Sequence, residues 1–407
     1  MRFFVFISLI LLIGTTAFSE TGTIYLKFAD LPGYLETGPA GRLVLSQRDA
    51  KVAAAKSTLQ WTNPELEAEH ENLSGDLVNE TETIFALSKT FMSPWTGAAH
   101  RKARNYEMEA NEHQRRQHHM TLMAEWKYRY VDIRIMSKLQ QRLDLFQKRI
   151  QEVSDISADR RKQGTVSGLE DLLLQMSVFN IKAMMIHLNS EIRQSRNVFK
   201  SQLGIPPDQE LILDSPVSFV KVDLASIKLD EAIMTSPHLN SLQKRVASAE
   251  KKITVEKGNL LPQFSLTGGY KQVNDDLKGG LVGLSFPLPL LSLNRASIRQ
   301  AHADLTTVSI EYDLAKAELM NRIRESSLLI EESQALLDEY GDMFQTSTVM
   351  NDLVFSFKEG WITLTDLFSS IEVYANAIDS YYTHMLHYYE NIFQLEAKTG
   401  EELVHFD

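Results

Sequence analysis

Residues 364–395 read LTDLFSSIEVYANAIDSYYTHMLHYYENIFQL and contain a heptad repeat. Two series of bulky side chains recur every seven residues, one at Leu364, Ile371, Ile378, Met385 and Ile392, the other at Leu367, Tyr374, Tyr381, Tyr388 and Leu395. A strict period of seven on a helix predicts left-handed supercoiling against neighbouring helices. Tyrosines at one seam position are unusual in a simple dimer and favour broader packing, as in a wall of helices. An ordinary coiled coil has the same pattern, so the repeat predicts architecture only.

Glycine and proline are distributed unevenly along the rest of the chain. Four stretches contain neither residue: 98–163, 169–203, 290–340 and 361–399. Such stretches are long helix candidates, because these two residues are the strongest breakers of regular structure. A helix over all of 98–163 would be roughly 100 Å long at about 1.5 Å per residue. Coiled coils and helical barrels hold helices of this length, and ordinary globular domains do not.

Two segments between the helix candidates have the pattern of β-hairpins. The first, about 63–93, has turn signals near Gly75, and the second, about 262–287, has them near Gly280. Each turn separates two runs of strand-forming residues, which is the expected signature of a hairpin.

The two halves of the chain repeat each other at offsets between 195 and 198 residues. Gly164 corresponds to Gly360, and Gly204 to Gly400. The first half also keeps a heptad, at Leu169, Leu172, Met176, Phe179, Ala183 and Ile186. Each half is predicted to contain a helix, a hairpin, a long helix, a tight turn and a helix. A duplication of this length indicates that a whole structural unit was copied.

This division predicts six segments. They are a signal peptide at 1–19, an N-terminal extension at 20–41, a first repeat at 42–204 with its tip near 164, a connector at 205–229, a second repeat at 230–400 with its tip near 360, and a C-terminal tail at 401–407. The signal peptide is predicted from Arg2, the apolar run from Phe3 to Ile13, and the small residues Ala17 and Ser19.

Composition excludes several classes of protein. The chain has no cysteine, so disulfides, thiolate metal sites and a lipidated cysteine are excluded. Its formal charge of -11 argues against nucleic acid and favours cationic solutes or partners. No stretch after the signal peptide is long and apolar enough for a helical membrane span. An exported chain of this kind is periplasmic, secreted or an outer-membrane β-barrel.

The series of motifs resembles the TolC-like outer-membrane efflux proteins over about 42–400. The residues that carry the resemblance are Ser236-Pro-His-Leu-Asn through Ala249-Glu250, Leu260-Leu-Pro-Gln-Phe-Ser-Leu, Gly283-Leu-Ser-Phe-Pro-Leu, Arg299-Gln-Ala, Phe357-Lys-Glu-Gly-Trp-Ile-Thr-Leu-Thr-Asp-Leu, and Gly204-Ile-Pro-Pro at the junction of the repeats. Asn63-Pro-Glu-Leu-Glu-Ala-Glu-His-Glu-Asn-Leu73 resembles the heavy-metal branch, whose members serve cobalt–zinc–cadmium or copper–silver efflux.

The resemblance implies an α+β membrane protein. Its fold would be a homotrimeric 12-stranded outer-membrane β-barrel, with four strands from each subunit, continued by a long periplasmic α-helical barrel. The implied function is the passive exit duct of a tripartite efflux system in a Gram-negative bacterium. Its partners would be a periplasmic adaptor and an inner-membrane transporter of the resistance-nodulation-division type. No catalytic residue, cofactor or metal site is implied, and drug efflux or type I protein secretion remain alternatives.

The first predicted strand carries an alternating acidic pattern. Its glutamates are Glu65, Glu67, Glu69 and Glu71. Because a strand has a period of two, all four carboxylates would share one face. In a barrel that face would line the lumen and favour cations. A solvated surface is the alternative.

Aromatic residues expected near strand ends are Trp61, Phe91, Trp95, Tyr270 and Phe286, where they would form an aromatic belt or pack the junction with the helices.

The tight turns at Gly164 and Gly360 would form the periplasmic tip in the resembled family. Asp366 matches the position of an aperture aspartate, with Asp171 as its counterpart in the first repeat, whereas Ser369 departs from the family's second aperture aspartate. Asp366 would alternatively be an acid favoured by a helix N-terminus. Trp361 and Ile362 are apolar at this tip and are expected either to contact the adaptor or transporter or to be buried in the trimer.

Two further classes of function have less support. The residues His113, His118, His119, Met120 and Met123 crowd one helix, but they lack the spacing of a helical zinc site, so a solvated face is expected. No phosphate loop, nucleophile elbow or metalloprotease motif indicates an enzyme. A soluble periplasmic coiled-coil scaffold would explain the heptads, but it would not explain the duplicated hairpins.

Overall fold

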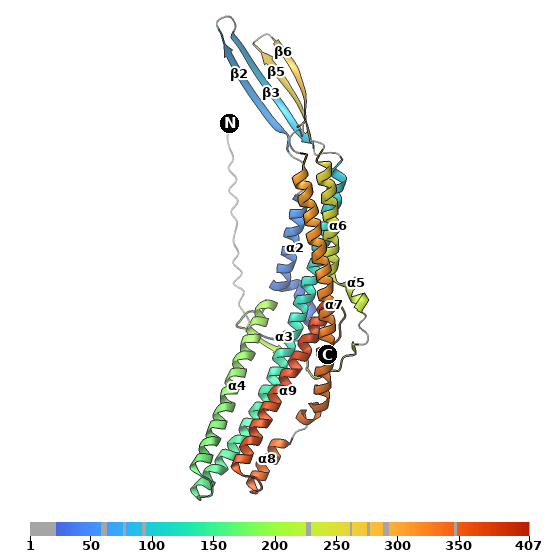
Figure 1. Ribbon diagram of the computed structural model, residues 1–407. Helices are drawn as coiled ribbons and strands as arrows, with labels where there is room; N and C mark the ends of the chain where they lie inside the picture. Colours follow the sequence, from blue (N-terminus) through green and yellow to red (C-terminus); the bar gives the residue numbers. More distant parts are fainter. Residues whose placement is uncertain are drawn as a thin grey trace, which may run out of the picture.

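The computed structural model describes residues 22–57, 63–75, 79–91, 95–224, 229–260, 263–274, 277–287, 293–345 and 348–406. Within these residues the chain forms a long rod, with two β-hairpins at one end and helices that run to the opposite end (Figure 1). The predicted signal peptide and Trp61 lie outside the described residues.

The helices and strands follow in one chain order. The helices are α1 (Leu31–Thr37), α2 (Pro39–Ser57), α3 (Gly97–Lys162), α4 (Gly168–Leu203), α5 (Leu229–Thr235), α6 (Pro237–Gly258), α7 (Arg295–Gln345), α8 (Val349–Lys358) and α9 (Leu364–Thr399), with a 3-10 turn at Phe28–Asp30. The strands are β1 (Thr23–Leu26), β2 (Glu65–Ser74), β3 (Asn79–Phe91), β4 (Glu210–Leu213), β5 (Phe264–Val273) and β6 (Leu277–Ser285). The long helices α3, α4, α7 and α9 lie in the four stretches without glycine or proline, except that α3 and α4 each begin at a glycine and α7 continues through Gly341.

The internal repeat is visible in the backbone. The elements α2, β2, β3, α3 and α4 are followed by α6, β5, β6, α7 and α9 in the same order. Among the described glycines, those with a positive φ are Gly164 (75°), Gly204 (80°), Gly360 (77°) and Gly400 (79°). They form the two pairs that the sequence alignment matches. Each lies just after a helix, where a left-handed residue ends the helix at little cost only if it is glycine. The repeats differ in that α3 is one helix, whereas α7 is followed by the short α8.

The two hairpins join in one antiparallel sheet with the strand order β2-β3-β5-β6. Residues far apart in sequence meet there, because β3 pairs with β5 from Glu82 opposite Val273 to Phe91 opposite Phe264. The strands lie in the segments for which the sequence predicts hairpins, and the pairing between the two hairpins comes from the tertiary structure.

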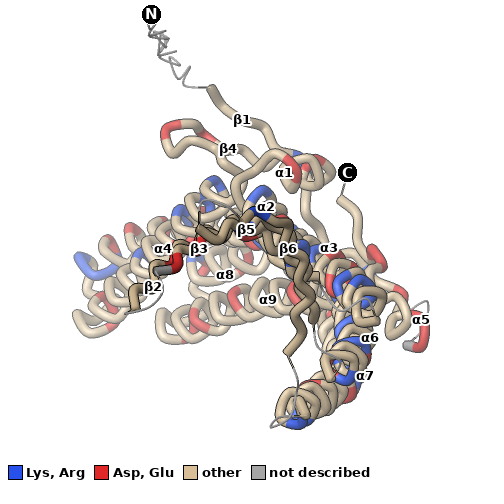
Figure 2. Tube along the Cα trace, turned by 90° about the horizontal axis from the view of Figure 1, so that it is seen from above, with Lys and Arg blue, Asp and Glu red and all other residues tan. Residues whose placement is uncertain are grey.

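The middle of the rod contains a second, two-stranded sheet that the sequence patterns do not predict. β1 pairs in parallel with β4, so the N-terminal extension packs against the connector. Tyr130 of α3 holds this sheet. Its hydroxyl donates to the Leu26 carbonyl at 3.1 Å and accepts from the Ser215 backbone N–H at 2.7 Å. Figure 2 shows β1, β4 and α1 gathered on one side of the row of helices.

The hydrophobic core has two parts along the rod. One lies in the middle and joins α3 and α9 to the connector, with Trp126, Tyr389 and Phe393 at its centre. The other lies toward the tip and joins α3, α4, α8 and α9 around residues such as Phe146 and Phe357. The sheet of hairpins contributes little to either part, and apart from the buried Ala86 its described side chains are exposed or half-buried.

Asp132 is a buried carboxylate between α3 and α4. The Ser195 hydroxyl donates to its Oδ2 at 2.9 Å, and Arg129 and Glu191 are the charged groups that act on it. Burial raises the pKa of Asp132 from 3.8 to about 6, which the Ser195 bond and Arg129 oppose. The folded chain therefore binds this proton more tightly than the unfolded chain, so stability falls as the pH rises from about 4 to about 6.

Replacement of Asp132 by asparagine should remove this loss. At pH 7.5 we expect the Asp132→Asn chain to be more stable than the wild type by on the order of 3 kcal/mol, because about two pKa units correspond to that free energy. At pH 4 the two chains should be equally stable. Thermal unfolding across pH 4–8 measures the difference. A gap that stays constant over this range would contradict the prediction.

Candidate functional site

The two faces of the sheet of hairpins differ, because one carries the glutamates and the other carries most of the large apolar side chains. The register of β2 and β3 places Glu67 opposite Ala86, Glu69 opposite Ile84, and Glu71 opposite Glu82. All four predicted glutamates of β2 are exposed and share this face. On the neighbouring strands the same face carries hydroxyl pairs, which are Thr90–Ser265 at 2.8 Å and Thr267–Ser88 at 3.2 Å. A largely polar surface therefore extends across β2, β3 and β5, interrupted by Ile84 and Ala86, whereas β6 adds mainly leucine and glycine to this face.

Two further carboxylates on this face were not recognised in the sequence. Glu80 and Glu82 of β3 lie opposite Leu73 and Glu71, so six glutamates share the surface. Lys271 of β5 forms an ion pair with Glu82. The period-two rule that placed the glutamates of β2 would also have grouped Glu80 with Glu82, but only the register shows that both strands present them to the same side.

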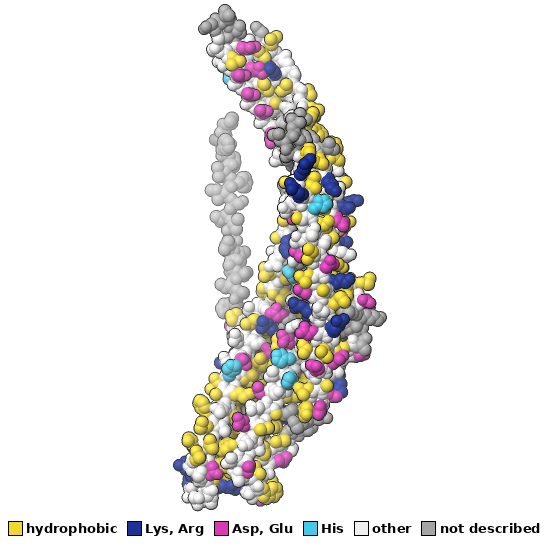
Figure 3. Space-filling view, viewed as in Figure 1, with side chains coloured by type: hydrophobic (Ala, Val, Ile, Leu, Met, Phe, Trp, Pro, Cys, Tyr) yellow, Lys and Arg dark blue, Asp and Glu magenta, His cyan; other side chains and the backbone are white. Residues whose placement is uncertain are grey.

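The opposite face of the sheet carries most of its large apolar side chains, together with polar residues such as His70, Thr83 and Lys89. Leu66 pairs with Leu87, Phe85 with Tyr270, and Gly268 with Val282, which is 85% exposed. Toward the helices, Phe91 and Phe264 stack with ring centroids 5.2 Å apart. Figure 3 shows hydrophobic and acidic side chains side by side over this end of the rod. The sheet therefore gathers its carboxylates and hydroxyl pairs on one side and most of its large apolar side chains on the other.

The tip at the other end is formed by two similar helix turns. The N-cap Ser167 begins α4 and the N-cap Thr363 begins α9, each with a reciprocal capping box. In the second turn the Asp366 carboxylate accepts from the Thr363 hydroxyl at 2.6 Å and from its backbone N–H at 3.1 Å. These bonds lower the pKa of Asp366, so its exposed carboxylate stays charged. Asp366 is thus a capping residue, as the alternative interpretation expected, and it also adds a negative charge at the tip.

In the turn of the first repeat, a different acid occupies the third position after the N-cap. Glu170, three residues after the N-cap, closes the capping box of α4. Asp171 is buried and forms an ion pair with Arg161 of α3. Asp171 and Asp366 therefore match in the Leu-x-Asp-Leu motif, but they occupy different positions in their helices. Each N-cap lies three residues after its glycine, so the extra residue falls after the N-cap and moves Asp171 by one position along the helix, where it is buried while Asp366 is exposed.

The apolar tip residues have different environments. Trp361 is 71% exposed and packs edge-on against Phe355, which is also exposed. Ile362 is half-buried against the core near the tip. Gly164 and Gly360 form the two turns in open space, since a Cβ built on either would meet no atom within 4 Å. Trp361 with Phe355 is therefore an exposed aromatic pair at the extreme end of the rod.

The two predicted heptads have opposite environments. Along α9 the seam is buried, with Leu367, Tyr388 and Leu395 fully covered, because α9 packs between α3 and α7. Along α4 the seam faces solvent, and Phe179 and Ile186 are each 69% exposed. Hydrophobic side chains are visible along α4 in Figure 3. α7 likewise exposes Ile310, Leu314 and Leu328.

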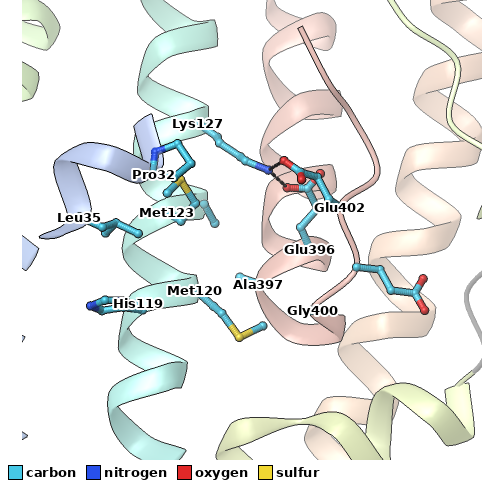
Figure 4. A pocket seen from close by; sticks show the side chains of 12 residues that line it. Pro32, Leu35, His119, Met120, Met123, Lys127, Glu396, Ala397, Gly400 and Glu402 are labelled. Carbon is cyan, nitrogen blue, oxygen red and sulfur yellow. Dashed lines mark hydrogen bonds and ion pairs between the residues drawn. The ribbon is translucent and has the colours of Figure 1, made fainter. Parts of the chain in front are cut away.

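A cavity of about 310 Å³ lies beside the buried cation Lys127. The Lys127 ammonium donates to Glu396 at 2.8 Å and to Glu402 at 2.6 Å. Figure 4 shows this contact and the His119 ring pointing to the other side of α3 from Met120. Burial lowers the pKa of His119. Among the described residues, no group of three histidine or acidic side chains is arranged to hold a metal ion.

Several solved outer-membrane channels have the same fold. The channel OprN matches with 17% identity and a TM-score of 0.77, covering 92% of this chain and 89% of that one. The open-state MtrE channel of Neisseria gonorrhoeae matches with 16% identity and a TM-score of 0.74, covering 92% and 88%. VceC of Vibrio cholerae matches with 12% identity and a TM-score of 0.73, covering 91% and 96%.

Sequence comparison gives a match to one part of the chain. No curated protein matches this chain. In the described part of the chain, no helix has the length and apolar character needed to cross a membrane. Residues 229–341, which run from α5 into α7, match the family described as outer membrane efflux protein. The chain thus has the fold of outer-membrane channels over nine-tenths of its length and the sequence signature of an efflux family over 229–341.

Proposed function

We propose that this chain is the outer-membrane channel of a tripartite efflux system, a passive exit duct and not an enzyme. The observation that carries the proposal is the two-faced sheet, whose polar face joins six glutamates to serine and threonine pairs while its other face carries most of the large exposed apolar side chains. The fold likeness to outer-membrane channels and the family match over 229–341 support it. The duct would lie in the outer membrane of a Gram-negative bacterium and extend into the periplasm.

The working form would be a homotrimer. Strands β2 and β6 are the two open edges of the sheet, and the antiparallel order β2-β3-β5-β6 makes them run in opposite directions. β2 of one subunit can therefore pair antiparallel with β6 of the next, and three copies close a 12-stranded barrel without an edge. The chain exposes 25683 Å² at 46.3 kDa, against roughly 16000 Å² for a compact monomer of that mass, which leaves much surface to bury by assembly.

The proposed solutes are heavy-metal cations. Three copies of the polar face would place eighteen glutamates, three times six, around the lumen, with Lys271 as the opposing charge that pairs with Glu82. Such a lining attracts cations by raising their local concentration. Drug efflux and type I protein secretion are the alternatives that the same duct would serve.

The tip is proposed to be both the aperture and the contact for partners. Three copies of Asp366 would form a carboxylate ring, and Asp171, through its pair with Arg161, would fix the neighbouring turn. The exposed pair of Trp361 and Phe355, with Ile362, Gly164 and Gly360, would contact a periplasmic adaptor and an inner-membrane transporter of the resistance-nodulation-division type.

A complementation experiment tests the solute. A strain lacking this chain is grown on zinc, cobalt, cadmium, nickel, copper and silver salts, and on hydrophobic drugs and detergents. We expect selective sensitivity to the metals, restored by the wild-type chain. Restoration should weaken severalfold when Glu65, Glu67, Glu69 and Glu71 are all replaced by glutamine, because the lumen then loses twelve carboxylates.

The matched control makes the same charge change in the helical wall, at Glu311, Glu331, Glu332 and Glu339, and should restore growth fully. Sensitivity to drugs alone would reject metal cations and keep the duct. A mature chain that stays soluble without detergent, and that does not fractionate with the outer membrane, would reject the duct in favour of a soluble scaffold.

A further inference from the structure

Three cations lie on one face of α3 beneath the connector between the two repeats. Arg134, Lys138 and Arg142 follow each other at intervals of four residues, so they share a face of the helix. Arg134 donates to the Leu213 carbonyl at 3.0 Å, and Lys138 donates to the Val217 carbonyl. These bonds tie the connector to α3, and both acceptors are neutral backbone carbonyls.

Among the described residues, no carboxylate forms an ion pair with Arg134 or Lys138. The ion pairs formed within the described ranges include neither residue, although the chain as a whole has a formal charge of -11. Burial lowers the pKa of Lys138, and the positive charges of Arg134 and Arg142 lower it further, with no acidic group acting in the other direction. A partly buried cation beside two others is unfavourable unless an anion compensates it.

A cavity of about 420 Å³ opens beside this row of cations. Its lining combines the polar side chains Lys138, Gln141 and Arg142 with the apolar Leu145, Phe219 and Met385, and Ser218, Tyr381 and Tyr382 complete it. The volume is in the range of about 300–1,000 Å³ that small-molecule sites occupy in proteins. The cavity therefore offers hydrogen-bond donors and positive charge together with apolar surface.

The connector and α9 form the walls of this cavity. Phe219 packs against Tyr388 with the rings tilted by 56° and their centroids 5.4 Å apart, and the neighbouring Ser218 carbonyl accepts from the Tyr389 hydroxyl at 2.5 Å. Tyr382 lies beside Arg142, which acts on the hydroxyl through a hydrogen bond and its charge. These contacts hold the walls in place without filling the cavity.

We propose that this cavity binds an amphiphilic anion, with its carboxylate or phosphate head at Lys138 and Arg142 and its apolar chain against Leu145, Phe219 and Met385. The guanidinium and the ammonium together offer charge-assisted hydrogen bonds to a single anionic head. The site lies at the connector, away from the polar face of the sheet and from the tip, so it does not depend on the proposed duct.

Binding is tested with the purified full chain in a nonionic detergent, using decanoate as the probe in isothermal titration. We expect one saturable site per chain. Arg142→Gln should weaken decanoate binding about tenfold, the loss that corresponds to one charge-assisted hydrogen bond. Phe219→Ala, which leaves all three cations in place, should weaken it by a similar factor through the apolar chain. Lys148→Gln removes an exposed cation of the same helix outside the cavity and should change nothing.

Three further probes distinguish the source of the ligand. Decyl phosphate binding alongside decanoate would support the site and favour lipid-like phosphates, whereas decanoate alone would support it and favour carboxylates. Equal binding of inorganic phosphate and decanoate would overturn the amphiphilic ligand. Equal binding of decyltrimethylammonium, or wild-type affinity in both variants, would show simple partition into detergent and overturn the proposal.

Discussion

Replacement of Phe179 by aspartate should leave the chain folded and prevent its assembly into a trimer. Phe179 is 69% exposed on the outward seam of α4, so its replacement removes no packing inside the subunit. In an assembly that covers this seam, each interface would lose about 1.5–3 kcal/mol of apolar burial. It would also have to bury a carboxylate without a partner, which costs more. Over three interfaces the association constant should fall by several orders of magnitude.

The oligomeric state of the purified chain measures this effect, by native mass spectrometry in detergent and by heat-resistant oligomers on gels. Asn180→Asp introduces the same charge at the neighbouring exposed position off the seam and should leave the trimer intact. If both variants remain trimeric, the α4 seam is not a subunit interface. If both lose the trimer, added charge near the wall is responsible and the seam has no special role.

Replacement of Lys127 by methionine should destabilise the middle of the rod by about 3–5 kcal/mol, because it leaves a buried carboxylate without its cation. Glu396 is buried, and its other oxygen already accepts from the backbone N–H groups of Leu403 and Val404, at 2.7 and 3.1 Å. Lys127 also lies over the rings of Phe28 and Phe393. Its loss therefore loosens α3, α9 and the C-terminal tail together.

Unfolding of the purified chain, followed by circular dichroism, measures the change. Glu402→Gln serves as the control, since Glu402 is half exposed and its pair with Lys127 is worth about 0–1 kcal/mol. The double replacement Lys127→Met with Glu396→Gln should recover part of the lost stability, because no charge then stays buried. A Lys127→Met chain as stable as the control would contradict the assignment of Lys127 as the buried counter-ion.

Much of the candidate site was accessible to pattern reasoning. Period two placed Glu65 to Glu71 on one face, and the strand register agrees. The same reasoning missed Glu80 and Glu82, since nothing in the sequence states which face of β3 aligns with which face of β2. It also paired Asp171 with Asp366, although Glu170 has the capping position of the first turn. One residue inserted after the N-cap rotates the following motif by about 100° around the helix axis, which local sequence matching does not register.

The sequence by itself determined the elements that depend on local chemistry. The absence of glycine and proline determined the long helices, and the four glycines with positive φ determined their ends, because few other residues adopt that backbone cheaply. Tertiary structure decided which of two equivalent heptads is covered. The seam of α9 is buried between α3 and α7, and the seam of α4 lies at the edge of the wall. A heptad specifies that a helix needs a partner along one face, and it carries no information about whether its own chain or another copy supplies that partner.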